Sequence, residues 1–136
     1  MGIGLHVGDI YYEIGTGDYL HSFFSSVSCH LEPGGWGTEY PFLMNELYSG
    51  TLRWEEALTV MEEIQAIRER LRLYGPSEVI WDIDDLALRP PWGEDISSDI
   101  TSLADYYVTS DGKDLIDVLL SALLLAYTEK QNLEIK

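Results

Sequence analysis

Basic residues are scarce in this sequence of 136 residues. It contains eight Lys and Arg against 24 Asp and Glu, which gives a formal net charge of −16 at pH 7. A surface with this charge repels the phosphates of nucleic acids and of anionic lipids. We therefore exclude nucleic acid and the membrane surface as direct partners and expect a basic protein instead.

Cysteine and targeting signals are also scarce. The single cysteine, Cys29, rules out an internal disulfide and fits a reducing compartment. The N-terminus has neither the basic region nor the long apolar core of a signal peptide. The richest apolar run, residues 115–127, contains Asp117 and is shorter than the roughly 20 residues of a membrane span. These absences predict a cytoplasmic protein in which this run is a core helix.

The chain has enough apolar residues to build a core of its own. Hydrophobic residues make up 46% of the sequence and aromatic residues 12%, which predicts a single domain over residues 1–136. The predicted elements follow the order β-β-α-α-α-β-α-β-α. This order is typical of an α+β domain. We expect a small, mostly antiparallel sheet, made of an N-terminal hairpin and later strands, packed with about four to five helices.

The first half of the chain has clear periodicities. Alternating apolar residues over 3–14 predict a hairpin with Gly8 and Asp9 in its turn. A helix is expected over 19–31 with Asp18 as its N-cap, followed by a loop over 33–37 that Trp36 anchors. A short helix over 41–50 and a long one over 52–74 complete this half, the latter with Leu58 and Met61 among its core residues.

The second half is predicted to contain three short strands and a final helix. Strands are expected over 78–81 and 106–109, with a short helix or turn over 97–105 between them. A helix over 113–130 is apolar almost all round, and an edge strand follows over 133–135. A helix that is apolar on every side lies in the centre of a fold or at a subunit interface. A homodimer formed through this helix, in a structural protein that self-associates, is therefore one alternative.

Carboxylates gather in residues 79–112, which we call the acidic stretch. Arg89 is its single basic residue. Like charges within a Debye length of about 8 Å repel one another, so the fold accepts a destabilising contribution here. Trp81, Trp92, Tyr106 and Tyr107 interleave with the carboxylates.

This combination is typical of a binding surface, because aromatic rings supply buried anchors while carboxylates steer a basic partner. We predict that the partner contacts Asp82, Asp84, Asp85, Trp92, Glu94, Asp95 and Asp99. Three alternatives remain open. The stretch is a solvated face that keeps the protein soluble, Trp81 and Asp82 are structural residues at a strand end, or Pro91 and Trp92 form a packed corner.

An enzymatic alternative comes from Asp82 and Asp84 after an apolar run. This pattern resembles the first motif of the haloacid dehalogenase hydrolases, in which one Asp attacks phosphorus and the second is the acid and base around magnesium. Leu86 stands where that motif has Thr or Val, and only about fifty residues follow. We therefore predict no catalytic residue and no cofactor. No metal site is expected either, because the potential ligands His6, His21, Cys29 and His30 lack a suitable spacing.

Several short motifs together resemble the immunity 70 family. They are Tyr12-Glu13-Ile14-Gly15-x-Gly17-Asp18, Leu20-His21-Ser22-Phe23-Phe24, Gly35-Trp36-Gly37, Tyr40-Pro41, Val79-Ile80-Trp81-Asp82-Ile83, Pro90-Pro91-Trp92-Gly93 and Val108-Thr109-Ser110-Asp111-Gly112. The resemblance covers almost the whole chain. It implies a cytoplasmic antitoxin that binds the C-terminal toxic domain of a bacterial polymorphic toxin, and it implies no catalytic residues. Where such a toxin is a nuclease, its phosphate site is basic and suits an acidic inhibitor.

Overall fold

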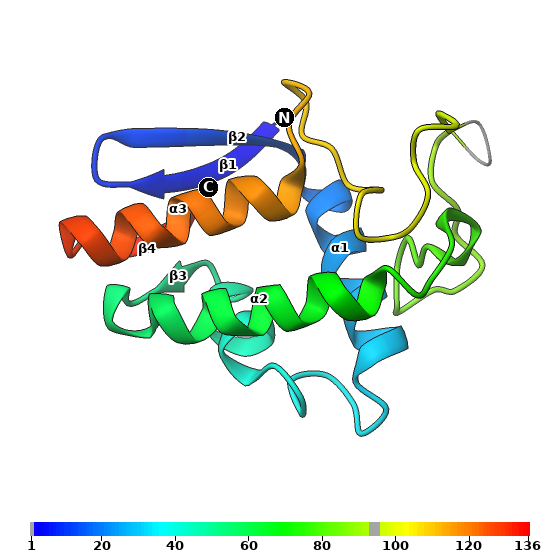
Figure 1. The fold of residues 1–136 in the computed structure, drawn as a ribbon, viewed down its shortest axis with the longest axis horizontal. Helices are drawn as coiled ribbons and strands as arrows, with labels where there is room; N and C mark the ends of the chain where they lie inside the picture. The colour runs from blue at the N-terminus through cyan, green and yellow to red at the C-terminus, as the bar shows by residue number, and fades with distance from the viewer. Residues whose placement is uncertain (1, 93–95) are drawn as a thin grey trace.

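The computed structural model describes residues 2–92 and 96–136, which fold as an α+β domain (Figure 1). Four antiparallel strands form one sheet in the order β2-β1-β4-β3. The predicted fold class is therefore confirmed. The predicted hairpin is formed by β1, Gly2–Val7, and β2, Ile10–Thr16. Its turn includes Gly8 at φ +57°, a left-handed conformation that glycine adopts without steric cost.

The sequence predicted the last strand at an edge of the sheet, but this strand lies inside the sheet. This strand, β4, covers Leu133–Ile135 and pairs with β1 on one side and with β3, Thr51–Leu52, on the other. The prediction was wrong because β3 has only two residues, too few to produce an alternating pattern. Leu133 is fully buried at the centre of this arrangement.

Helix α1, Gly17–Leu31, is buried along most of its length. Its N-cap is Thr16 and not the predicted Asp18, since the Thr16 hydroxyl accepts a hydrogen bond of 3.2 Å from the backbone N–H of Tyr19. Asp18 instead lies in the first turn, where a carboxylate is favoured by the helix dipole. In Figure 1, α1 runs at a steep angle to the other two helices of 15 residues.

Helices α2, Ala57–Leu71, and α3, Leu115–Glu129, run side by side in opposite directions (Figure 1). The hairpin packs on the other side of α3. This position buries Leu119 and Leu123 fully, whereas Leu124 stays 52% exposed, so the homodimer through α3 stays a prediction. Residues 2–92 and 96–136 contain no helix that is both long and apolar enough to cross a membrane.

The sequence predicted one long helix over 52–74, and the structure shortens it. A 3-10 turn, Trp54–Glu56, precedes α2. Leu58 is 42% exposed, so its predicted place in the core was wrong. Leu58 follows Ala57 in the sequence but lies outside the buried face of α2. This face consists of Ala57, Val60, Ile64, Ile67 and Leu71.

The segment before β3 forms a short π-helical turn, Phe42–Leu47, where the sequence predicted a helix. Trp36 anchors the preceding loop as expected, because its indole N–H donates a hydrogen bond of 2.7 Å to the carbonyl of Met44. The Glu63 carboxylate of α2 accepts a hydrogen bond of 2.8 Å from the backbone N–H of Leu43. This contact ties the turn to α2.

Candidate functional site

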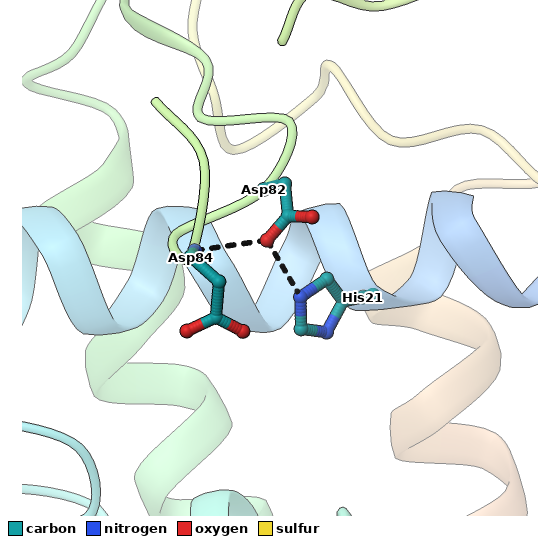
Figure 2. A group of neighbouring side chains, drawn as sticks. All are labelled: His21, Asp82 and Asp84. Carbon is teal, nitrogen blue, oxygen red and sulfur yellow. Dashed lines mark hydrogen bonds and ion pairs between the residues drawn. The ribbon is translucent and has the colours of Figure 1, made fainter. Parts of the chain in front are cut away.

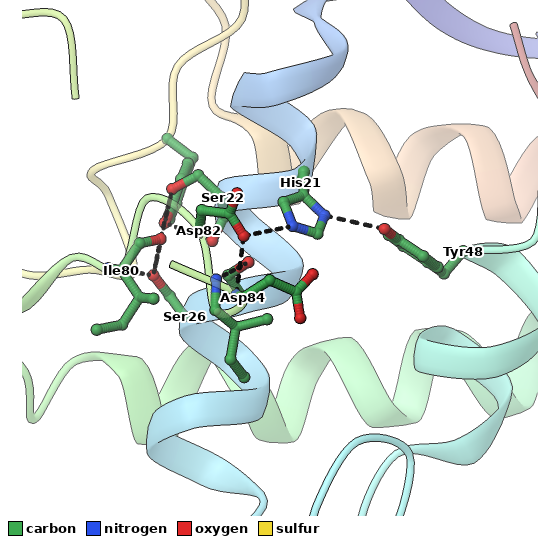
Figure 3. A network of polar contacts seen from close by, with 10 residues as sticks. His21, Ser22, Ser26, Tyr48, Ile80, Asp82 and Asp84 are labelled. Carbon is green, nitrogen blue, oxygen red and sulfur yellow. Dashed lines mark hydrogen bonds and ion pairs between the residues drawn. The ribbon is translucent and has the colours of Figure 1, made fainter. Parts of the chain in front are cut away.

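The backbone of the acidic stretch is held on α1 by buried serines (Figure 3). The Ser22 hydroxyl donates to the carbonyl of Ile80 at 2.8 Å, and the Ser26 hydroxyl accepts from the Ile80 N–H at 3.0 Å. The Ser25 hydroxyl accepts from the Ile83 N–H at 3.1 Å. These bonds replace those of a strand partner. The predicted strand over 78–81 was therefore wrong, since a 3-10 turn, Pro76–Glu78, and an irregular segment occupy this place.

Tyr107 completes the buried network beneath this segment. Its hydroxyl donates to the carbonyl of Ser22 at 3.0 Å and lies 2.8 Å from the Ser26 hydroxyl. Burial raises the pKa of Tyr107, so the phenol stays neutral. Tyr106 and Tyr107 are only 4% and 1% exposed, so these two rings of the acidic stretch are core residues. The predicted strand over 106–109 is also wrong, because this part makes only an isolated bridge between Val108 and Asp114.

Asp82 turns back towards α1 and contacts His21 (Figure 2). One Asp82 carboxylate oxygen lies 3.3 Å from His21 Nε2 and accepts a hydrogen bond of 2.9 Å from the Asp84 N–H. On the other side of the ring, His21 Nδ1 lies 2.9 Å from the Tyr48 hydroxyl. Burial, with the nearby charges of Asp84 and Asp82, raises the pKa of Tyr48. These contacts hold the turn at Asp82, and Asp82 also stays a predicted contact of the partner.

This cluster is also the part of the site that suits a cation. One ligand atom each of His21, Asp82 and Asp84 lies within 4.8 Å of the other two. An imidazole nitrogen with two carboxylate oxygens is a donor set that divalent transition metals accept. The sequence did not indicate this grouping, because 61 residues separate His21 from Asp82.

The other predicted contacts differ in their surroundings. Asp84, Asp85 and Asp99 are exposed. The Asp85 carboxylate accepts a hydrogen bond of 3.2 Å from the Ala87 N–H. Glu94 and Asp95 lie outside the described residues. All seven residues remain predicted contacts, and the structure shows three of them as exposed carboxylates.

The Asp105 carboxylate supports the backbone of the residues that precede it. It accepts hydrogen bonds of 2.9 Å and 3.3 Å from the backbone N–H groups of Ser102 and Thr101. Partial burial opposes ionisation, but these hydrogen bonds outweigh it and lower the pKa of Asp105. They close a turn within 97–105, where the sequence predicted a short helix or turn.

Trp92 is 38% exposed and is the indole that the sequence placed correctly at the surface. Its ring N–H donates a hydrogen bond of 2.8 Å to the Tyr106 hydroxyl, so the buried Tyr106 supports it. The ring lies edge-on to Trp81 at 5.4 Å and to Tyr19 at 6.0 Å between centroids. The sequence did not indicate Tyr19 as part of this site. The helical period places Tyr19 on α1 but does not show that its ring meets Trp92.

The phosphohydrolase alternative does not fit this geometry. Its nucleophile must stand at the carboxyl end of a strand, whereas Asp82 follows an irregular segment. The Asp82 carboxylate is already engaged by His21 and by the backbone of Asp84. The arrangement is suited to presenting charge on a fixed backbone.

Comparison with known proteins adds a family to this description. A family model described as immunity protein 70 matches residues 5–135. Neither a curated protein nor a solved structure matches the chain. The match begins in β1 and ends in β4, so it includes α1 and the whole acidic stretch.

Proposed function

Since the chain belongs to the immunity protein 70 family, we propose that it binds and neutralises the C-terminal toxic domain of a bacterial polymorphic toxin. The family makes it an immunity protein of a toxin system, and such proteins are generally not enzymes. The cytoplasm, where newly made toxin would otherwise harm the producing cell, is the compartment that we propose.

One observation supports the acidic stretch as the binding surface. The exposed Asp84 and Asp85 follow a backbone segment, Ile80 to Ile83, that the buried Ser22, Ser25 and Ser26 hold against α1. A surface that is already ordered loses less conformational entropy on binding than a flexible loop does. The stretch therefore combines negative charge with preorganisation, and the proposed contacts are those predicted from the sequence.

The chemistry of the partner follows from this charge. A basic toxin surface would be steered towards the carboxylates and oriented by them. Where the toxin is a nuclease, the carboxylates take the place of substrate phosphates in its basic site. An interface of roughly 1,600 Å² with a few desolvated anchors is large enough for nanomolar affinity.

A plating assay tests this function. The C-terminal domain encoded by the large open reading frame beside this gene is expressed in a sensitive host, with and without this protein. Growth restored only by co-expression supports the proposal. A neighbouring domain that is harmless, or that kills equally in the presence of this protein, contradicts it.

A further inference from the structure

Three aromatic rings form the walls of an open cavity beside the acidic stretch. We call Tyr19, Trp81 and Trp92 the aromatic cage. The centroid distances are 6.5 Å for Tyr19 to Trp81, 6.0 Å for Tyr19 to Trp92 and 5.4 Å for Trp81 to Trp92. The three interplanar angles are 50°, 67° and 84°. Rings at such distances and angles pack edge to face, so together they form one continuous aromatic wall of the cavity.

Two of the three walls are fixed through their polar ends. The Tyr19 hydroxyl accepts a hydrogen bond from the backbone N–H of Val108, and the Trp92 ring donates to the Tyr106 hydroxyl. Burial raises the pKa of Tyr19 to about 12, so its ring remains a neutral phenol at physiological pH. The cage is therefore shaped before any ligand arrives.

The cavity that the aromatic cage lines has a volume of about 450 Å³. Ile14, Pro91 and Val108 add apolar lining, and Asp18 brings a carboxylate. A second carboxylate, that of Glu13, is hydrogen-bonded at 2.7 Å to the hydroxyl of Ser110, which also lines the cavity. Among the described lining residues there is no Lys or Arg.

We propose that the aromatic cage binds a Lys or Arg side chain of the partner protein. Ring faces carry negative potential and attract a cation that has left water, and a nearby carboxylate adds to this attraction. The alternative occupant, a neutral apolar side chain, would gain nothing from Asp18 or from the net charge of −16. The inference rests on the proposed function for the identity of the partner.

A peptide titration tests the cage without the toxin. The probes are acetyl-Gly-Arg-Gly-amide, its Lys counterpart and its citrulline counterpart, which has nearly the shape of arginine but no charge. The readout is the NMR signals of the tryptophan indole N–H groups. We expect the signals of Trp81 and Trp92 to shift saturably with the Arg or Lys peptide and about tenfold more weakly with citrulline. Equal binding of citrulline, or no shift with either cation, would overturn the proposal.

Three variants place the binding in the cage. Trp81→Leu keeps an apolar side chain but removes a ring, and Asp18→Asn removes the charge at an exposed position. Trp54→Leu is the matched control, because Trp54 precedes α2 and packs on Tyr127, outside the cage. We expect the first two variants to weaken binding of the Arg peptide and the control to preserve it. Circular dichroism verifies that each variant is folded. If Trp81→Leu does not fold, the binding of the Arg peptide to Asp18→Asn tests the proposal.

The same variants then separate this inference from the proposed function. If the wild-type chain protects cells from the toxin but Trp81→Leu and Asp18→Asn bind the toxin as tightly as Trp54→Leu does, the cage proposal fails and the function stands. If the wild-type chain gives no protection, the function fails, while the peptide titration still shows whether the cage binds cations.

Discussion

Three serines on α1 determine where the acidic stretch lies. Ser22, Ser25 and Ser26 are fully buried, and each bonds to the backbone of Ile80 or Ile83. Serines are polar, and polar residues of a helix ordinarily face solvent. The burial of these serines depends on a segment more than fifty residues further along the chain, which no local pattern reveals.

Replacing Ser26 by alanine should destabilise this contact selectively. The change leaves the Ile80 N–H and the Tyr107 hydroxyl each without one hydrogen-bond partner. We expect a loss of about 1–3 kcal/mol in the free energy of unfolding, measured by urea denaturation, with faster hydrogen exchange at Ile80. Ser121→Ala on the exposed side of α3 is the control. Equal stability of the two variants would show that the serine contacts contribute little.

Glu63 gives a prediction for pH. Burial raises its pKa above the ordinary 4.5, and the nearby charges of Glu32 and Glu46 act in the same direction. A carboxyl group with a higher pKa in the folded chain binds its proton more tightly when folded. Its contribution to stability is therefore most favourable below pH 4.5 and is lost as the pH rises through the folded pKa.

Glu63→Gln should consequently stabilise the protein at pH 7. The amide oxygen can still accept the hydrogen bond from Leu43, while the penalty of the buried charge disappears. We expect a gain of roughly 0.5 kcal/mol in urea denaturation, because Glu63 is only half-buried and solvent screens its charge. The gain should shrink as the pH falls towards 4. Glu62→Gln, which removes an exposed charge next to it, is the control. A pH-independent difference would contradict this explanation.

At the scale of elements, the sequence predicted those with a strong period of their own. The hairpin, α1, α2 and α3 were all found, since the apolar residues of each recur with a regular period or form a long apolar run. The failures were β3, the central place of β4, and the strands expected over 78–81 and 106–109. In each of these cases hydrogen-bond partners far along the chain decide the structure, such as Ser26 for Ile80 or Leu52 for Leu133.

The sequence predicted only the part of the candidate site that is continuous along the chain. Several carboxylates and Trp92 stand close together in the sequence, so the exposure of Asp84, Asp85, Asp99 and Trp92 could be predicted. The partners Tyr19 and His21 come from α1, and only the folded chain shows that they lie beside Trp92 and Asp82.

The central position of β4 predicts a large effect at Leu133. This side chain is fully buried in a strand that joins β1 to β3. Leu133→Ala should cost about 2–5 kcal/mol of stability through the cavity that it leaves. Leu73→Ala, the same change at a side chain that is 83% exposed, should cost less than about 0.5 kcal/mol. Similar unfolding midpoints for the two variants in urea would contradict the packing of β4.

On the scale of the whole molecule, the net charge of −16 and the placement of charge have different consequences. A uniformly negative surface attracts any basic protein, and salt weakens this attraction. A specific interface needs charges at defined positions. Asp84 and Asp9 allow the two to be compared, because both are exposed. Asp9 lies in the β1–β2 turn, at the opposite end of the molecule from the loop that follows α2 (Figure 1).

The most direct test of the account is therefore a calorimetric titration of the toxin domain with three chains: wild type, Asp84→Lys and Asp9→Lys. The two variants have the same net charge. We expect Asp84→Lys to weaken binding by at least about tenfold, Asp9→Lys to stay near wild type, and all affinities to fall between about 50 mM and 200 mM salt. Equal affinities for both variants, or no binding by the wild-type chain, would contradict the claim that the acidic stretch neutralises the toxin.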